Sequence, residues 1–263
     1  PQTLHQDIWE LFQMISAAKE NNANKITVIM PYVSYARSDK EWGDEKYIFG
    51  MAVAGKFLIK LLDASGAARF IGIDFHSKEF ERFFAGSYKE PPMSFDHLSA
   101  LPLFTRYLET KDLRNTILLA GDKGAMRNAT LLAGRLDIPI ELVGSVDKTR
   151  LSDTEVRIVN INIDVAGKDV IIFDDEISPV ATTLKALVKE LKKRRAKSVI
   201  VAVTHASITQ DTIRSLQKLD MIRELIVTDT VPIPEEARKL LPLRVLSVAG
   251  LIAEKIKEIS EES

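Results

Sequence analysis

Short apolar runs rich in β-branched residues recur along the chain and alternate with stretches of helical periodicity. The runs lie at residues 26–30, 70–74, 117–120, 138–143, 170–173, 199–203 and 225–227. They are continuous rather than alternating, which is typical of strands buried on both faces by helices. Helical patterns occupy residues 1–22, 49–62, 125–136 and 182–195. This alternation predicts an α/β protein with mainly parallel sheets flanked by helices.

Residues 88–103 interrupt this rhythm, because Pro91, Pro92 and Pro102 fall in a segment without a clear period. We interpret the segment as a loop that joins one α/β unit to the next. A length of 263 residues fits two ordinary domains. We therefore place a domain boundary within residues 104–114. The stretch 243–259 predicts a short strand followed by an amphipathic helix.

The charge balance narrows the choice of partners. Lys and Arg number 36 and Asp and Glu 37, giving a net charge of −1. Nucleic acid and anionic membranes are therefore not expected as partners, and an anionic ligand must be bound by a local site. The absence of cysteine excludes disulfides and thiolate chemistry and fits the cytoplasm. The first residues lack signal-peptide features and an initiator Met, so we interpret the chain as processed or as a fragment.

Two acids, Asp174 and Asp175, follow the apolar run 170–173 and precede a loop and a helix start near Thr182. In open α/β sheets, ligands bind beyond the carboxyl ends of strands, where a helix N-terminus offers N–H groups to phosphate. Carboxylates suit ribose hydroxyls and Mg²⁺. Acids that only cap the following helix explain the same pattern.

Two further candidates follow the first two apolar runs. Arg37 lies in a polar turn, where a guanidinium suits polyphosphate or a purine ring, although a plain surface charge is the alternative. His76 follows the run 70–74 and offers an imidazole to a metal or phosphate, whereas a structural role is the commoner outcome. We interpret His5, His97 and His205 as structural.

Asp122 lies between Gly121 and Gly124, just before a predicted helix. Small residues around a carboxylate at a helix N-terminus suit a sugar phosphate with a metal nearby. Lys148 and Arg150 alternate in the polar run 145–154, which lacks the periodicity of packed structure and is interpreted as a mobile lid. Two cations on a closing loop would stabilise charge in phosphoryl transfer, and a solvated loop is the alternative.

Five collinear segments together resemble the ribose-phosphate pyrophosphokinase (PRPP synthetase) family. Residues 26–40 are similar to its strand and YARQDR-like ATP segment, and 74–77 to its D-x-H element. Residues 121–125 resemble its P-D-x-G turn, 147–150 its K-x-R catalytic loop, and 174–182 its phosphoribosyl-binding loop. The resemblance covers essentially the whole chain.

The resemblance implies two tandem phosphoribosyltransferase-type I domains. Residues 1–108 would form an N-terminally incomplete ATP-side domain, 109–242 the ribose 5-phosphate side, and 243–263 a strand and helix returning to the first domain. The implied reaction transfers the diphosphoryl group of ATP to the 1-hydroxyl of ribose 5-phosphate, giving PRPP and AMP with Mg²⁺. The implied assembly is a homo-oligomer built from dimers, or a hetero-oligomer with an active synthetase.

The resemblance also assigns roles. It implies Lys148 and Arg150 as catalytic, and it implies ATP binding by Arg37, Ser38, Asp39 and His76. It implies metal binding by His76 and Asp122. Ribose 5-phosphate is implied to be bound by Asp122, Arg150, Asp174, Asp175, Ser178, Pro179, Val180, Ala181 and Thr182.

Two departures from the family pattern keep a second function open. The family has Thr and glycines where this chain has Pro179, Val180 and Ala181, which remove one N–H donor and disfavour a positive φ. One lost charge-assisted hydrogen bond costs about 1.5 to 3 kcal/mol. The sequence also starts after the family's F-x-D-G-E-like stretch. The alternative is a non-catalytic regulatory subunit; an ordinary phosphoribosyltransferase would not explain residues 35–37 or 148–150.

Overall fold

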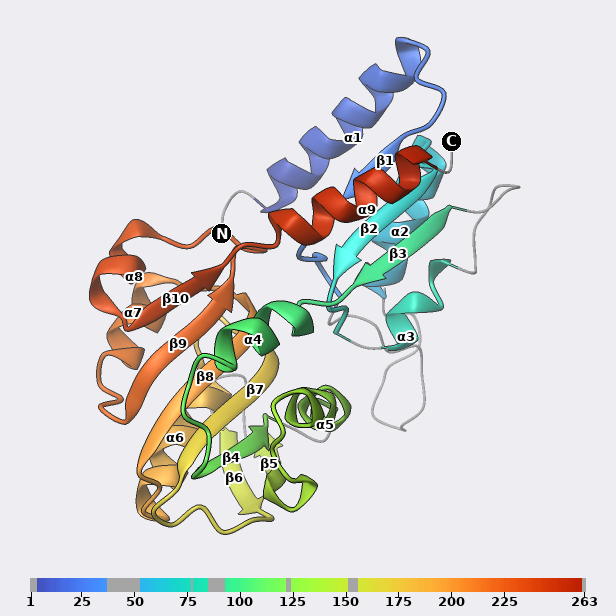
Figure 1. Ribbon diagram of the computed structural model, residues 1–263. Coiled ribbons are helices and arrows are strands. Elements are labelled where there is room, and N and C mark those ends of the chain that lie inside the picture. The colour runs from blue at the N-terminus through green and yellow to red at the C-terminus, as the bar shows by residue number, and fades with distance from the viewer. Residues whose placement is uncertain are drawn as a thin grey trace, which may run out of the picture. The chain divides into compact units, whose positions relative to one another are not determined.

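The computed structural model describes residues 4–36, 53–76, 78–84, 93–121, 124–150 and 156–261 (Figure 1). The chain divides into two compact units, Pro1–Ser99 and Ala100–Ser263. Helix α4 (Leu101–Leu108) therefore belongs to the second unit, whereas the predicted second domain begins at residue 109. The predicted return of residues 243–263 to the first domain concerns the placement of the units and stays a prediction.

In the described part of the first unit, three parallel strands form a sheet in the order β1-β2-β3. They are β1 (Thr27–Ile29), β2 (Arg69–Ile73) and β3 (Ser94–Leu98). The helices are α1 (Leu4–Glu20), α2 (Ala54–Ser65) and the short α3 (Lys78–Glu81), and α1 contacts α2. Phe70, Phe75, Phe80 and Phe84 pack ring against ring in the core of this unit, so burial of aromatic surface holds α3 near the end of β2.

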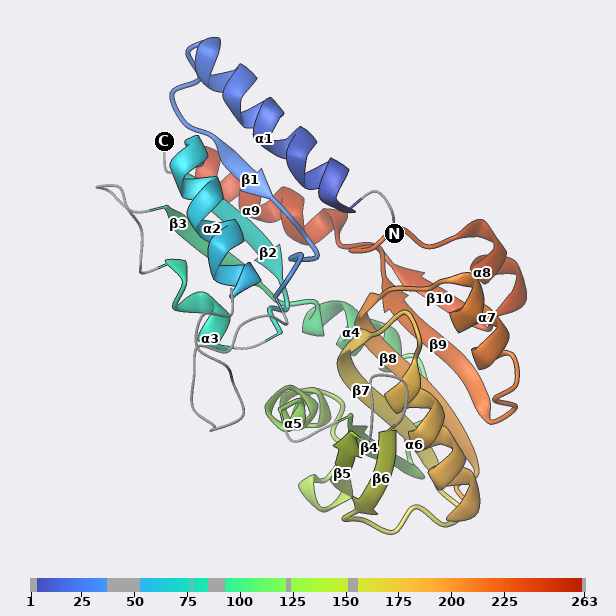
Figure 2. The ribbon, with the colours of Figure 1, turned by 180° about the vertical axis from the view of Figure 1, so that it is seen from behind.

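The second unit contains a seven-stranded sheet in the order β10-β9-β8-β7-β4-β5-β6. Its strands are β4 (Thr116–Ala120), β5 (Val143–Arg150), β6 (Val156–Ile161), β7 (Asp169–Ile177), β8 (Ser198–Ala206), β9 (Ile222–Thr228) and β10 (Leu243–Leu246). All neighbours pair in parallel except β5 and β6. The helices after α4 are α5 (Met126–Arg135), α6 (Thr182–Lys193), α7 (Gln210–Leu216), α8 (Glu235–Leu240) and α9 (Ala249–Glu261). Figures 1 and 2 show α4 on one face of this sheet and α6 on the other, so β7 and β8 are buried on both faces, as their continuous apolar runs predict.

Two predictions around β5 are wrong. The predicted strand 138–143 is instead a 3₁₀ turn, η2 (Ile140–Leu142), and the strand begins at Val143. Residues 145–150 of the predicted lid belong to β5, which pairs antiparallel with β6. Strands β5 and β6 are the last two in the strand order of the sheet. Their side chains can face solvent there, so the sequence of this hairpin does not need a regular apolar pattern. Residues 151–154 of the predicted lid lie outside the described residues.

The predicted loop 88–103 is also partly wrong. Residues 94–98 form β3, and Pro102 stands in the first turn of α4, where its missing N–H costs nothing. Strand β7 continues to Ile177 rather than ending at residue 173, so the acidic residues that were expected to follow the strand lie within it.

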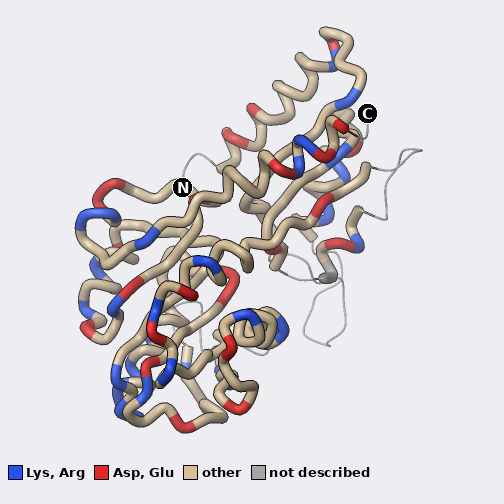
Figure 3. Tube along the Cα trace, viewed as in Figure 1, with Lys and Arg blue, Asp and Glu red and all other residues tan. Residues whose placement is uncertain are grey.

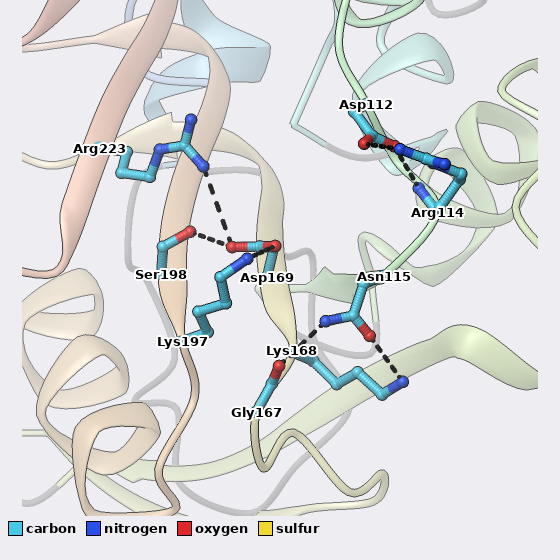
Figure 4. Close-up of polar contacts among 9 residues, drawn as sticks. All are labelled: Asp112, Arg114, Asn115, Gly167, Lys168, Asp169, Lys197, Ser198 and Arg223. Atoms are coloured by element: carbon cyan, nitrogen blue, oxygen red, sulfur yellow. Dashed lines mark hydrogen bonds and ion pairs between the residues drawn. The ribbon is translucent and has the colours of Figure 1, made fainter.

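The amino ends of the strands in this sheet carry a network of polar contacts (Figure 4). The Asp169 carboxylate accepts hydrogen bonds from the Ser198 hydroxyl and from Lys197 Nζ at 3.0 Å, with Arg223 4.0 Å away. Nearby, Asn115 bonds the carbonyl of Gly167 at 3.0 Å. We call this side of the sheet the amino edge.

Charges of both signs are interspersed along the described chain (Figure 3). This mixture agrees with the near-zero net charge of −1. Among the described helices, none is long and apolar enough to cross a membrane.

Candidate functional site

The carboxyl ends of β4, β5 and β7, which we call the carboxyl edge, bring three predicted segments together. The N–H of Gly121 donates to the carbonyl of Phe173 at 3.0 Å. A Cβ atom at Gly121 would lie 2.1 Å from Oδ2 of Asp174, so only glycine leaves room for this carboxylate. Lys148 Nζ lies 3.4 Å from the carbonyl oxygen of Gly121. The structure therefore brings together Gly121, which follows β4, Lys148 of β5 and Asp174 of β7.

The acids of β7 are half-buried and lie within a paired strand. Asp174 stands opposite Val203 and Glu176 opposite His205 on β8. The N–H of Asp175 bonds Oδ1 of Asp174 at 3.0 Å. A half-buried carboxylate held in this way can accept hydroxyl groups of a sugar.

The loop between β7 and α6, residues 178–181, is a tight turn that we call the phosphate loop. It is closed by a hydrogen bond of 2.8 Å from the Ala181 N–H to the Ser178 carbonyl. Ala181 has φ 49° and ψ 35° and is the N-cap of α6. The positive φ that its side chain disfavours is thus adopted here, at a cost of roughly 1 to 2 kcal/mol. Ala181 is only 2% exposed, so packing of its methyl group in the core holds this conformation.

Backbone N–H groups at the start of α6 remain available to a ligand. Within the described part of the chain, no protein acceptor bonds the N–H groups of Val180, Thr182 or Thr183. The positive end of a twelve-residue helix adds to their attraction for an anion. These N–H groups suit a phosphate group. Asp174, on the strand that precedes the loop, suits the hydroxyl groups of a sugar attached to that phosphate.

In the first unit, the turn after β2 is held by β3. The N–H of Phe75 donates to Nε2 of His97 at 3.0 Å, and Nδ1 of His97 bonds Glu81 at 2.7 Å. The rings of Phe75 and His97 stack with centroids 4.2 Å apart. His76 follows in an exposed position beyond the end of β2. The histidine at 97 therefore has a structural role, as its sequence context indicates.

The other histidines that we interpret as structural also bond protein groups. Nδ1 of His5 lies 2.8 Å from the hydroxyl of Tyr35, and Nδ1 of the buried His205 lies 2.9 Å from Oγ1 of Thr230.

Several predicted site residues cannot be placed. Arg37, Ser38, Asp39 and Asp122 lie outside the described residues, as does the side chain of Arg150, whose backbone ends β5. Among the residues that the structure does describe, no group of three or more His, Asp or Glu is arranged to hold a metal ion.

Comparisons with known proteins find one family for both units. Residues 1–66 match the N-terminal domain of ribose phosphate pyrophosphokinase, and residues 153–263 match the phosphoribosyl synthetase-associated domain. The ribose-phosphate pyrophosphokinase of Synechococcus elongatus is 31% identical over 261 residues, which are 99% of this chain and 74% of that protein. That of Deinococcus radiodurans is 38% identical over 256 residues, 96% of this chain and 75% of that protein.

A solved structure shows the same fold over the full chain. The crystal structure of phosphoribosylpyrophosphate synthetase from Mycobacterium smegmatis superposes with a TM-score of 0.85 and 31% identity, covering 100% of this chain and 80% of that one. With relatives above 30% identity over nearly its whole length, this chain belongs to the ribose-phosphate pyrophosphokinase family.

Proposed function

We propose that this protein is a cytoplasmic ribose-phosphate diphosphokinase that forms PRPP and AMP from ATP and ribose 5-phosphate. The observation that carries the proposal is the phosphate loop, whose N–H groups at the start of α6 have no acceptor among the described residues. The loop follows the strand that carries Asp174, and Asp174 and Lys148 both lie next to Gly121. The relatives named ribose-phosphate pyrophosphokinase support it. The PRPP formed would be used for nucleotide biosynthesis.

The phosphate loop would bind the 5-phosphate of the sugar. Val180 and Thr182 offer backbone N–H groups, while the proline at 179 has none and the Ala181 N–H is used within the turn. Asp174 and Asp175 would accept the ribose hydroxyls. This assignment requires fewer backbone donors than a glycine-rich loop supplies.

Lys148 would stabilise the charge that develops as the diphosphoryl group moves. The ribose 1-hydroxyl oxygen attacks the β-phosphorus of ATP and its proton passes to water. The bond from the β-phosphorus to the oxygen that bridges the α- and β-phosphates breaks, and AMP leaves with that oxygen. Lys148 is an exposed side chain of β5 at the carboxyl edge, so its ammonium can turn toward a ligand bound beside Gly121. Arg150, two residues further along the strand, would add a second cation.

The nucleotide would bind through Arg37, Ser38, Asp39 and His76. Carboxylate oxygens at the carboxyl edge fit Mg²⁺, which prefers oxygen ligands, and we propose His76 and Asp122 as further metal-binding residues. When bound with ATP, Mg²⁺ neutralises charge on the phosphate oxygens. We also propose a homo-oligomer built from dimers.

A direct assay tests the proposal. Purified protein is incubated with ATP, Mg²⁺ and ribose 5-phosphate, and AMP and PRPP are measured by chromatography. Equal amounts of the two products are expected. A folded preparation that binds both substrates and forms neither product would refute the enzymatic function.

The alternative, a non-catalytic subunit that binds an active synthetase, is favoured by one observation: the phosphate loop contains a proline and uses one of its own N–H groups internally. It predicts no turnover by the protein alone and a changed rate when an active synthetase is added. Measuring both rates in parallel separates the two functions.

A further inference from the structure

The start of α7 holds the phosphate loop through two threonine hydroxyls. Thr209, the N-cap of α7, donates from Oγ1 to the carbonyl oxygen of Pro179 at 3.1 Å. Thr212 Oγ1 donates to the same oxygen. Thr212 is fully buried, at 0% exposure, whereas Thr209 is exposed. A carbonyl of the phosphate loop is therefore tied to a helix about thirty residues away along the chain.

The two threonines also bond each other, and their Oγ1 atoms lie 3.0 Å apart. Thr212 Oγ1 accepts the N–H of Thr209 at 3.2 Å, and Thr209 Oγ1 accepts the N–H of Thr212 at 3.2 Å. Each hydroxyl has a single proton to donate. When both protons point at Pro179, every one of these polar atoms has a partner, so the reciprocal cap of α7 and the anchoring of the loop form one unit.

These bonds occupy the carbonyl groups that would repel a phosphate. The carbonyl of Ile177 accepts the N–H of Ser207 at 3.0 Å, that of Ser178 accepts from Ala181, and that of Pro179 accepts the two hydroxyls. Carbonyl oxygens carry partial negative charge, and an anion site must keep them away. The carbonyls of Ile177, Ser178 and Pro179 are thus bound to protein donors, whereas the N–H groups of Val180 and Thr182 have no acceptor among the described residues.

The same contacts explain how the turn is maintained without glycine. The proline ring fixes φ at 179, and two hydroxyl bonds fix the orientation of the following peptide group. Ala181 is then held in its left-handed conformation by the closed turn on one side and by core packing on the other. Anchoring from α7 thus supplies the constraint that offsets the strain at Ala181.

We propose that Thr209 and Thr212 are positioning residues for ribose 5-phosphate, which act by holding the phosphate loop in its phosphate-accepting conformation. They touch no substrate in this role. The inference rests on the proposed function of the loop, and it concerns sugar-phosphate affinity rather than the chemical step.

The test compares Thr212→Val, which keeps the shape and removes the hydroxyl, with Thr212→Ser, which restores the hydroxyl. The control is Thr105→Val, because Thr105 is also buried and bonds a helix carbonyl, that of Leu101, at 3.0 Å. Calorimetry gives the dissociation constants of ribose 5-phosphate and of ATP with Mg²⁺, and kinetics give the KM of each substrate. Thermal unfolding measures stability in every variant.

We expect Thr212→Val to raise the dissociation constant and the KM of ribose 5-phosphate about tenfold while changing those of ATP less than about twofold. Thr212→Ser should stay within about threefold of the parent protein, and Thr105→Val should leave both substrates unaffected beyond about twofold. A Thr212→Val protein that binds ribose 5-phosphate as tightly as Thr105→Val overturns the inference.

Two further outcomes keep the inference and the proposed function distinct. If the parent protein binds ribose 5-phosphate but forms no PRPP, the enzyme proposal fails, and weaker binding by Thr212→Val still supports the positioning role. If the parent does not bind ribose 5-phosphate, the positioning role fails too. Should Thr212→Val not fold, Thr209→Val on the exposed partner repeats the test, and unchanged affinity there overturns the inference.

Discussion

The amino edge and the carboxyl edge of the seven-stranded sheet contain similar polar residues, but these residues differ in how far they are hydrogen-bonded within the protein. At the amino edge, Asp169 is bonded by Ser198 and Lys197 (Figure 4). Glu224 is bonded there by Lys111 and Tyr107. At the carboxyl edge, N–H groups at the start of α6 have no acceptor among the described residues, and a non-glycine residue adopts a left-handed conformation. One edge satisfies its polar groups internally; the other leaves donors for a ligand.

The charges at the amino edge show the effect of this pairing. Burial by itself would raise the pKa of Asp169, but hydrogen bonds from Ser198 and Lys197 and the nearby charge of Arg223 outweigh it and lower the pKa. Burial would also raise the pKa of Glu224, but hydrogen bonds from Lys111 and Tyr107 outweigh it and lower that pKa. Strain and open donors are typical of binding sites, and mutual pairing is typical of structural networks. The comparison therefore separates function from stability within one sheet.

The largest expected effect is on catalysis at the carboxyl edge. Lys148→Ala should lower kcat by about a hundredfold or more, since it removes a cation that stabilises the transition state, and it should weaken ATP binding far less. Steady-state kinetics and nucleotide binding measure both. Lys168→Ala at the amino edge, where Lys168 bonds Asn115, is the matched control and should leave kcat unchanged. Equal losses in rate and ATP affinity would contradict the transition-state role.

Gly121→Ala should damage the site because its Cβ would overlap the Asp174 carboxylate, at 2.1 Å from Oδ2. We expect a loss of about 1 to 3 kcal/mol in unfolding free energy, together with weaker ribose 5-phosphate binding. Urea unfolding and calorimetry test this. Gly134→Ala in α5 has open space around the new Cβ and should instead stabilise the protein by about 0.5 to 1 kcal/mol. If Gly121→Ala bound ribose 5-phosphate as tightly as the parent protein does, the position of Asp174 would not matter for sugar-phosphate binding.

Asp169→Asn should reduce stability without affecting catalysis, because it removes the charge that Lys197 and Ser198 bond. We expect a loss of about 1 to 2 kcal/mol at neutral pH. Asp220→Asn, which breaks the exposed pair with Lys192, is the control and should cost less than about 0.5 kcal/mol. If Asp169→Asn lowered kcat as much as a carboxyl-edge variant does, the amino edge would not be limited to a role in stability.

The pH dependence of the Asp169→Asn effect has a definite sign. The folded-state pKa of Asp169 is lowered, so its carboxylate contributes stability that is fully present above the unfolded-state pKa of about 3.9. That contribution is lost as pH falls through the lower, folded-state pKa. Urea unfolding of both proteins at a series of pH values should therefore show the difference shrinking in acid, and a difference that grows there would be inconsistent with this pairing.

The smallest expected effect is at Ala181. Ala181→Gly should relieve the left-handed strain but lose a buried methyl group, so the two contributions nearly cancel and stability should change by less than about 0.5 kcal/mol. The same substitution at Ala186 within α6 should cost about 1 kcal/mol. Thermal unfolding of the pair measures the difference, and equal losses would mean that Ala181 carries no strain.

Patterns in the amino-acid sequence were enough to predict the alternation of strands and helices, the buried strands at 170–173 and 199–203, and the motifs that carry the family resemblance. These features depend on local sequence, because apolar periodicity and helix-start residues indicate the burial and the secondary structure of the few residues around them. Thr209 and Thr212 were not identified from the sequence, because nothing in the Thr-x-x-Thr pattern indicates the loop that these residues bond.

The folded structure was needed to show that polar residues 145–150 form an outer strand of the sheet, that Lys148 lies beside Gly121, and that Thr212 bonds Pro179. Each of these contacts joins residues far apart along the chain, so its existence depends on strand order and on the packing of the whole sheet. Ala181 is the clearest case: its local preference opposes a positive φ, and the closed turn and the surrounding core override that preference.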